Sequence, residues 1–339
     1  MKYVKFTLSL LLVLVVFYCL NGKFGSIPPI AKFLNPYTGV WQNETDESIE
    51  GEVIIDGIKE NVTVHYDRHL IPHIFAQNDA DLYRAQGYIT AKHRLWQMDF
   101  QTIASAGRLS EIIGEKALNF DRQQRRRGMG YGAEQSLKKM KADQKGLEFL
   151  QAYTAGVNAY ISQLRAKDLP VEYKLLDYQP EPWTTKKTAL LLMYMVKDLA
   201  SREHDLEYTN ALRLFGKERF DLLFPDFYDD IDPIIPKETD WSFIDVAMTS
   251  RPAVDIPLDK VAETLERPHP DNGSNNWAVS GSKSYSGNPI LANDPHLALN
   301  LPSIWFVMQL STPDHSCLLY TSDAADDTQF VVGGGGGGG

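Results

Sequence analysis

The most informative stretch of the chain is Gly273-Ser-Asn-Asn-Trp-Ala-Val-Ser-Gly-Ser-Lys283, followed after a short gap by Pro289-Ile-Leu-Ala-Asn-Asp-Pro-His-Leu297. From Trp277 the residues alternate as in a strand, and the run after Pro289 forms a second strand-like segment. The Ser-Tyr-Ser-Gly-Asn cluster between them, at 284–288, is typical of a turn. The sequence therefore predicts a β-hairpin that begins at a Gly-Ser junction.

The spacing within this hairpin returns a histidine to its first serine. Ser274 lies 11 residues before Tyr285, at the centre of the turn, and His296 lies 11 residues after it. Antiparallel strands that leave a turn end on the same side. We therefore expect His296 to lie at the end of the hairpin that holds Ser274, where it can orient the serine.

A serine that follows a glycine can cleave its own peptide bond. The Ser274 hydroxyl can attack the Gly273 carbonyl, because glycine tolerates the strained backbone that this attack needs. Cleavage leaves Ser274 with an α-amine whose pKa of about 7.7–8.0 suits a general base for its own hydroxyl. The residues alone leave open the simpler interpretation of an ordinary hairpin.

The hairpin resembles the start of the β-chain in the penicillin acylase family of N-terminal-nucleophile hydrolases. Four upstream motifs resemble the α-chain of that family: Ile71-Pro-His-Ile74, Asp81-Leu-Tyr-Arg-Ala-Gln-Gly-Tyr88, Arg94-Leu-Trp-Gln-Met-Asp99 and Gly107-Arg-Leu-Ser-Glu111. The resemblance extends from about residue 50 to Gln309 and implies the N-terminal fragment of a precursor. Leu70 departs from the family pattern, in which glycine often precedes Ile-Pro-His-Ile.

The resemblance implies a hydrolase that acts on N-acyl amides such as a penicillin or an acyl-homoserine lactone. Ser274 would be the catalytic nucleophile after self-cleavage between Gly273 and Ser274, and His296 occupies the position next to it. The family's oxyanion-hole residues lie further along the β-chain. We therefore expect the fragment itself to be inactive, and the remainder of the β-chain to be its partner.

The resemblance further implies an acyl pocket and a structural calcium ion, with no organic cofactor. Met195 and Leu199 are the candidates for the pocket. The α-chain calcium ligand is a carboxylate near Asp205-Leu-Glu207, where Glu207 is preferred and Asp205 stays open.

The pattern along the chain predicts an α+β fold. Asn78-Asp79 can cap a helix that continues through apolar residues at helical spacing, and residues 131–165 and 185–215 are also helical by period. The resemblance implies a mainly helical α-chain domain and the start of an αββα sandwich. The predicted segments are a tether at 25–50, the α-chain at 51–223, a spacer at 224–273 and the start of the β-chain at 274–316.

The two ends of the chain are predicted to lie outside this fold. At residues 1–24, Lys2 and Lys5 precede an apolar run at 6–20, which indicates a signal peptide or a signal anchor. No small-x-small cleavage site follows the run, which favours an uncleaved anchor over a cleaved signal peptide. Either interpretation places the remainder on the periplasmic or cell-surface side of a membrane. Residues 317–339 resemble a translated sequencing adapter that ends in seven glycines, so we expect the protein's own sequence to stop near Ser316.

Composition excludes several other classes of protein. The net charge of −10 argues against a nucleic-acid partner, and two cysteines in 339 residues exclude a disulfide scaffold. His65, His69 and His73 would align on a helix as metal ligands, but Pro72 and the alternation of residues predict a strand there. The alternative function is a non-catalytic, envelope-anchored binding or scaffold protein with an acylase fold.

Overall fold

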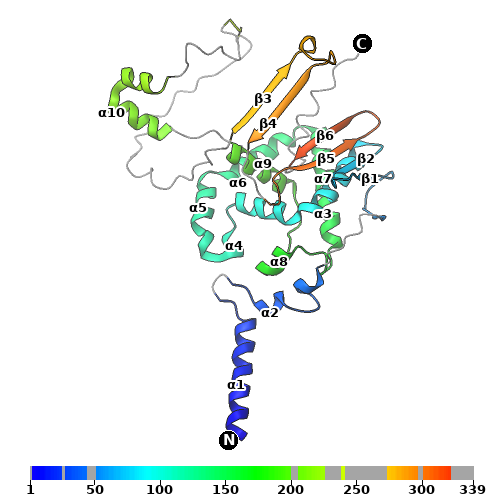
Figure 1. Cartoon of the computed structure of the whole chain (residues 1–339), viewed down its shortest axis with the longest axis vertical. Coiled ribbons are helices and arrows are strands. Elements are labelled where there is room, and N and C mark those ends of the chain that lie inside the picture. The colour runs from blue at the N-terminus through cyan, green and yellow to red at the C-terminus, as the bar shows by residue number, and fades with distance from the viewer. Residues whose placement is uncertain are drawn as a thin grey trace. The chain divides into compact units, whose positions relative to one another are not determined.

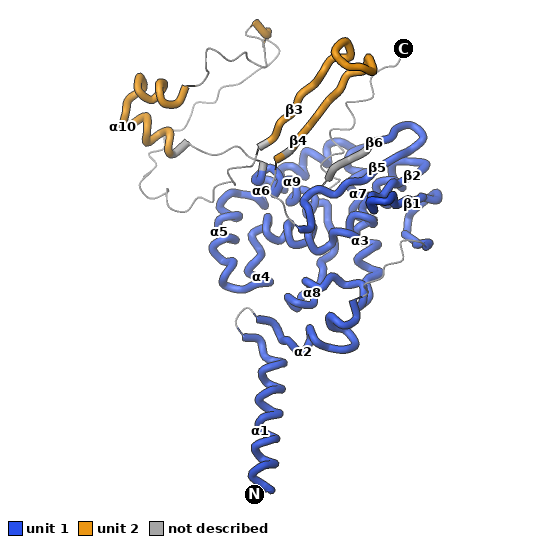
Figure 2. Tube along the Cα trace, viewed as in Figure 1, with its two compact units in different colours: residues 1–198, 299–339 blue, residues 199–298 orange. Residues whose placement is uncertain are grey.

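The computed structural model of the chain describes residues 2–24, 27–43, 51–199, 205–225, 238–240, 273–296 and 301–321. These residues belong to two compact units, one of residues 1–198 and 299–339 and one of residues 199–298 (Figure 2). Most of the predicted spacer at 224–273 lies outside the described residues.

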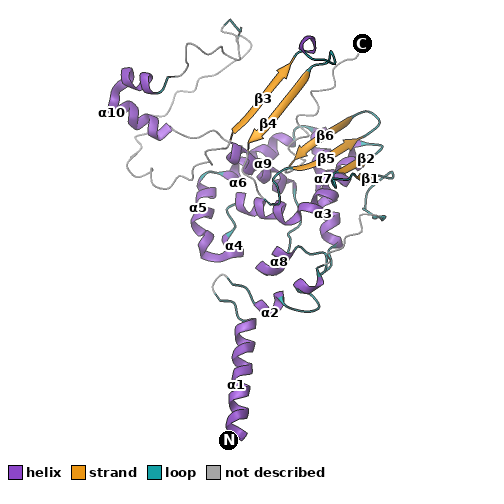
Figure 3. Ribbon diagram, in the orientation of Figure 1, coloured by secondary structure: helices purple, strands orange, loops and turns teal. Residues whose placement is uncertain are grey.

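The first unit combines many helices with one small sheet (Figures 1 and 3). Its helical elements are α1 (Lys2–Asn21), α2 (Ile30–Phe33), η1 (Val40–Gln42), α3 (Asp79–Ser105), α4 (Ser110–Ile113), η2 (Gly114–Ala117), α5 (Leu118–Arg126), α6 (Met129–Met140), α7 (Gln144–Gln163), α8 (Val171–Leu176) and α9 (Thr185–Leu199). Its strands are β1 (Thr63–Tyr66), β2 (Pro72–Phe75), β5 (Phe306–Ser311) and β6 (Ser316–Thr321). This combination confirms the α+β class.

Helix α3 confirms the prediction of a capped helix that starts after Asn78. The Asn78 side chain accepts a hydrogen bond from the Asp81 amide, which satisfies one of the free N–H groups at the helix start. The apolar residues at helical spacing are all buried: Leu82, Ala85, Ile89, Leu95, Met98 and Ile103. Beyond the helix end, Gly107 has a φ of 65°, a left-handed conformation that favours glycine.

Helices α3 and α7 cross in close contact at a pair of glycines. A Cβ atom at Gly87 would lie 2.2 Å from the carbonyl oxygen of Tyr153, and one at Gly156 would lie 1.9 Å from that of Arg84. Neither gap can hold a methyl group. Gly87 lies in the stretch 81–88 that resembles the acylase α-chain, so this motif has a packing role.

The sheet of the first unit has the strand order β1-β2-β5-β6. Strand β2 is antiparallel to β1 and parallel to β5, and β6 is antiparallel to β5. His65 lies on β1 and His73 on β2, which confirms the predicted strands, and the two are cross-strand partners. Ile74 pairs with Leu310, and both side chains are buried in the core cluster that includes residues of α3.

The boundaries of the two compact units differ from the boundaries of the predicted segments. The predicted α-chain at 51–223 divides after residue 198, and the predicted start of the β-chain at 274–316 divides after residue 298. The pairing of β2 with β5 explains the second division, because it brings residues 306–311 into the first unit. Strand β6 extends this sheet to Thr321, inside the segment expected not to belong to the protein.

The segment predicted as an exposed tether is attached to α8 through its described part. The buried Lys174 Nζ donates to the carbonyl oxygen of Gly39 at 3.1 Å and to Asn43 Oδ1 at 2.5 Å. Asn43 Nδ2 in turn donates to the carbonyl oxygen of Leu169. These partners lie 126 to 135 residues apart along the chain, so no local sequence pattern predicts the attachment.

The second unit contains α10 (Asp205–Leu223), β3 (Gly273–Val279), η4 (Gly281–Lys283) and β4 (Ile290–His296). Helix α10 is kinked at Gly216, which has a φ of 72°. Strands β3 and β4 pair in antiparallel fashion along their whole length. The predicted hairpin is therefore confirmed.

Candidate active site

The Gly273–Ser274 junction forms the first two positions of β3. The register pairs Gly273 with His296 and Ser274 with Pro295. The hairpin thus returns His296 to the end that holds Ser274, as predicted. The direct partner of His296 is nevertheless Gly273, because the centre of the pairing falls just before Tyr285 and not on it.

The register decides on which face each side chain lies. Cross-strand partners share a face of a sheet, and successive residues of a strand alternate between faces. In the uncleaved chain the exposed Ser274 side chain therefore lies on the face opposite to that of His296. The imidazole shares its face with Gly273, on the carbonyl side of the predicted cleavage point.

His296 has a carboxylate partner that the sequence analysis missed. Its Nε2 lies 2.7 Å from Asp294 Oδ2, and the two side chains are 39% and 68% exposed. A carboxylate only accepts hydrogen bonds, so a neutral imidazole in this contact carries its proton on Nε2. The spacing of two residues on a strand, which places both on one face, was the available signal.

The two pocket candidates lie one turn apart on α9. Met195 is buried, and the side chain of Leu199 lies outside the described residues. Residues four apart share one side of a helix. Their assignment to an acyl pocket stays a prediction.

The two calcium candidates lie in the first turn of α10. Glu207 is exposed, and the side chain of Asp205 lies outside the described residues. Among the described residues, no group of three or more His, Cys, Asp or Glu could hold a metal ion. The calcium ion stays a prediction.

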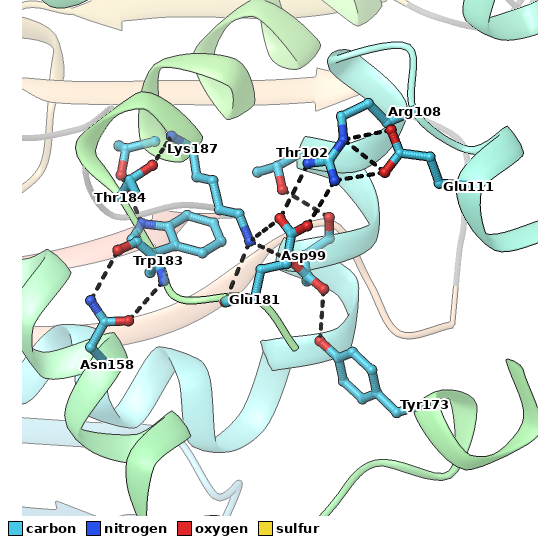
Figure 4. A network of polar contacts seen from close by, with 11 residues as sticks. Asp99, Thr102, Arg108, Glu111, Asn158, Tyr173, Glu181, Trp183, Thr184 and Lys187 are labelled. Atoms are coloured by element: carbon cyan, nitrogen blue, oxygen red, sulfur yellow. Dashed lines mark hydrogen bonds and ion pairs between the residues drawn. The ribbon is translucent and has the colours of Figure 1, made fainter. Parts of the chain in front are cut away.

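A polar network, buried at Asp99 and Lys187, connects two of the α-chain motifs in the first unit (Figure 4). Lys187 Nζ lies 2.7 Å from Asp99 Oδ1, and these side chains are only 9% and 1% exposed. Tyr173 OH donates to Asp99 Oδ2 at 3.2 Å. Glu181 contacts both Lys187, at 3.4 Å, and Arg108, at 2.7 Å. The network therefore joins α3, α8 and α9.

Burial and pairing shift the pKa values of this network. Burial raises the pKa of Asp99, although Lys187 opposes that rise. A hydrogen bond from Arg108 lowers the pKa of Glu181 to about 2. Burial also raises the pKa of Tyr173, which keeps its hydroxyl neutral as a donor. The charged groups of the network face one another, which fits a structural role.

Sequence reasoning missed this network, although Asp99 and Arg108 lie in quoted motifs. Asp99 follows Leu95 and Met98 on the apolar side of a helix, and a carboxylate there signals a buried charge. Its partner Lys187 is 88 residues away, and nothing in the local pattern connects the two.

Comparison with known proteins matches residues 61–320 to the penicillin amidase family. The chain is 34% identical over 259 residues to the penicillin acylase 2 proenzyme of Pseudomonas sp. strain SE83, a match that covers 76% of this chain and 33% of that protein. It is 29% identical over 263 residues to the acyl-homoserine lactone acylase QuiP of Pseudomonas aeruginosa, with 77% and 30% covered. The chain thus spans about a third of the length of these curated relatives.

Among solved structures, the thermostable penicillin G acylase from Alcaligenes faecalis in tetragonal form is similar, with a TM-score of 0.45 and 25% sequence identity. The match covers 53% of this chain and 98% of that one.

Proposed function

Because the chain belongs to the penicillin amidase family, we propose that the whole protein is a precursor that cleaves itself at Gly273–Ser274 and then hydrolyses N-acyl amides. The observation that carries the proposal is the register of β3 and β4, which pairs His296 with Gly273 at the cleavage point. The substrate class is that named for the relatives, a penicillin or an acyl-homoserine lactone.

Self-cleavage is a reaction between two neighbouring residues, Gly273 and Ser274. Ser274 Oγ adds to the Gly273 carbonyl carbon, and its proton passes to the departing Ser274 nitrogen as the C–N bond breaks. The resulting ester joins Gly273 to Ser274 Oγ. Water then hydrolyses the ester, so that Gly273 gains a free carboxylate and Ser274 a free α-amine.

In substrate hydrolysis Ser274 Oγ is again the nucleophile, and the α-amine released by self-cleavage is the base. The α-amine of Ser274 takes the hydroxyl proton while Oγ attacks the amide carbon of the substrate. The amine product leaves with that proton, and water hydrolyses the acyl-enzyme ester to release the acid. His296 is proposed to lie beside the new N-terminus after cleavage and to hold the α-amine in place. Met195 and Leu199 are proposed to contact the acyl group.

The proposed whole protein completes the αββα sandwich that the β3–β4 hairpin begins. The pairing of β2 with β5 joins residues on both sides of the cleavage point in one sheet. The two chains are therefore expected to stay together after cleavage. The 339-residue chain by itself is expected to show no amidase turnover, because catalysis needs oxyanion donors from the remainder of the β-chain.

We also propose that α1 anchors the protein in a membrane, with the rest of the first unit on the periplasmic or cell-surface side. Among the described residues, α1 is the one helix long and apolar enough to cross a membrane, with a mean hydropathy of 2.2. None of its residues is buried. Lys2 and Lys5 at its start favour an N-terminus on the cytoplasmic side.

Expression of the full-length gene with a Ser274→Ala substitution tests the proposal. Parent protein should appear as two chains, one with Ser274 at its N-terminus by mass spectrometry, and should hydrolyse N-acyl amides. The Ser274→Ala variant should remain one inactive chain, while the control Ser282→Ala, in η4, should behave as the parent. A parent protein that remains a single chain without turnover supports the alternative of a non-catalytic envelope protein.

A further inference from the structure

The segment that follows α1 exposes several large apolar side chains. We call these six residues the apolar patch, and their exposed fractions are Phe24 (45%), Ile27 (55%), Ile30 (42%), Leu34 (42%), Tyr37 (82%) and Trp41 (70%). Apolar side chains scattered singly over a surface need no explanation, whereas a contiguous exposed apolar patch marks an interaction surface.

The apolar patch is part of a folded segment that is attached to the first unit. Asn35 Oδ1 accepts hydrogen bonds from the Tyr37 and Thr38 amides, and a Cβ atom at Gly39 would lie 2.2 Å from the carbonyl oxygen of Phe33. Helix α2, which carries Ile30, contacts α8 (Figure 1), and Lys32 Nζ lies 2.9 Å from Asp177 Oδ2 just beyond α8. The patch therefore has a definite position on the unit.

The charge of this segment differs from that of the rest of the chain. On the side of α1 where the patch lies, residues 22–43 contain two lysines, Lys23 and Lys32, and no Asp or Glu, although the whole chain has 44 acidic residues. An anionic lipid surface attracts such a segment and repels the acidic remainder.

The apolar patch also begins where the apolar helix ends. The Tyr18 ring, in the last turn of α1, packs edge-on against Phe24 with 5.9 Å between ring centroids. Tyrosine and tryptophan are enriched where a membrane span meets the headgroups, because their rings have an apolar body and a polar edge. A lipid surface thus accounts for the exposure, the charge and the position of the patch together.

We propose that the apolar patch lies in the headgroup region of the membrane that α1 spans, so that the first unit is docked on the lipid surface through α2 and α8. This proposal rests on the proposed anchor and adds a second point of membrane contact. The docked unit has a fixed orientation, which an anchor with an exposed tether does not provide.

Spin labels on the full chain, reconstituted through α1 into vesicles, test the docking. A nitroxide is attached at Thr38→Cys, beside Tyr37, in a Cys19→Ser, Cys317→Ser background. The matched control is Tyr131→Cys on α6, outside the patch. Tyr131 is 69% exposed, about as much as the patch residue Trp41 at 70%. Phosphatidylcholine vesicles with about one quarter phosphatidylglycerol supply the anionic surface.

The label at position 38 should collide more with dissolved oxygen and several-fold less with a water-soluble nickel chelate than the label at position 131. Added Tyr37→Ser and Trp41→Ser substitutions should restore nickel access at position 38 while the chain stays in the vesicles. Equal nickel access at both positions would overturn the docking. Shielding of position 38 from both reagents would overturn it too, since that result indicates a protein occupant.

Extraction of the same vesicles with alkaline carbonate separates this proposal from the one on which it rests. If carbonate releases the chain, the anchor is wrong and the docking with it. If the chain is retained while position 38 is open to nickel, the docking alone is wrong.

Discussion

Leu70 has a backbone conformation that glycine adopts more easily than leucine. Its φ of 61° lies in the left-handed region, and the turn around it is held by Asp67 Oδ1, which accepts from the His69 and Ile71 amides. For a leucine this conformation is strained, because its Cβ approaches the following carbonyl oxygen. Glycine, which the family resemblance places here, avoids this contact.

Leu70→Gly should therefore stabilise the protein, by about 0.5–1 kcal/mol in the free energy of unfolding. The side chain is largely exposed, so its removal costs little burial. Urea denaturation measures the change. Leu70→Ala removes the same side chain and keeps the strain, and an equal gain in this control would show that the left-handed conformation is not the cause.

Burial distinguishes two neighbouring lysines of α9 that each form an ion pair at 2.7 Å. Lys187 contacts the buried Asp99, whereas Lys186 contacts the exposed Glu134. Lys187→Met should lower the free energy of unfolding by about 3–5 kcal/mol, because it leaves a buried carboxylate without its cationic partner. Lys186→Met should cost less than about 1 kcal/mol. Losses of similar size in both variants would contradict the structural role of the network.

At the scale of elements, helix α3 and the β3–β4 hairpin were predictable from sequence because their signals are local. The cap at Asn78, the helical spacing of apolar residues and the alternation after Trp277 all concern residues close in the chain. The crossing of α3 with α7 was not predictable, because it depends on Gly87 and Gly156, which lie far apart in sequence and have no apolar side chain to signal burial.

Gly87→Ala and Gly156→Ala should each force the two helices apart and lower the free energy of unfolding by about 1–3 kcal/mol. Gly130→Ala, in α6, is the control, because a Cβ atom there meets nothing within 4 Å. That variant should be neutral or stabilising by up to about 1 kcal/mol, owing to the higher helix propensity of alanine. Thermal unfolding of the three variants compares them, and a stable Gly87→Ala protein would mean that the crossing is loose.

At the scale of the whole molecule, the protein should lose stability in acid. The pKa of Glu181 is about 2 in the folded protein, below its ordinary value of 4.5, and hydrogen bonds hold the pKa values of Asp67 and Asp81 below 3.8. A carboxyl whose pKa is lower in the folded state stabilises the protein above the unfolded pKa. That stabilisation disappears as the pH falls from 4.5 toward 2.

Glu181→Gln should flatten the dependence of the unfolding free energy on pH between about 4.5 and 2, measured by urea denaturation at several pH values. It should also lower stability at neutral pH, since Arg108 loses a carboxylate partner. The control Glu148→Gln changes an exposed carboxyl on α7 and should follow the parent curve. An unchanged slope in Glu181→Gln would exclude this residue as a source of acid sensitivity.

The sequence by itself determined helix α3, the β3–β4 hairpin and the family of this protein, because caps, periodicity and motifs reside in residues that are near one another. It also determined that His296 returns to the end of the hairpin that holds Ser274, since chain length on either side of a turn fixes which ends meet.

Only the tertiary structure decided the contacts between distant residues: the parallel pairing of β2 with β5, the buried contact of Asp99 with Lys187 and the attachment of residues 27–43 to α8. It also decided the face on which His296 lies. A shift of one residue in strand register moves every side chain to the other face of the sheet. The geometry of the turn sets this register, and the number of residues on either side of the turn does not reveal it.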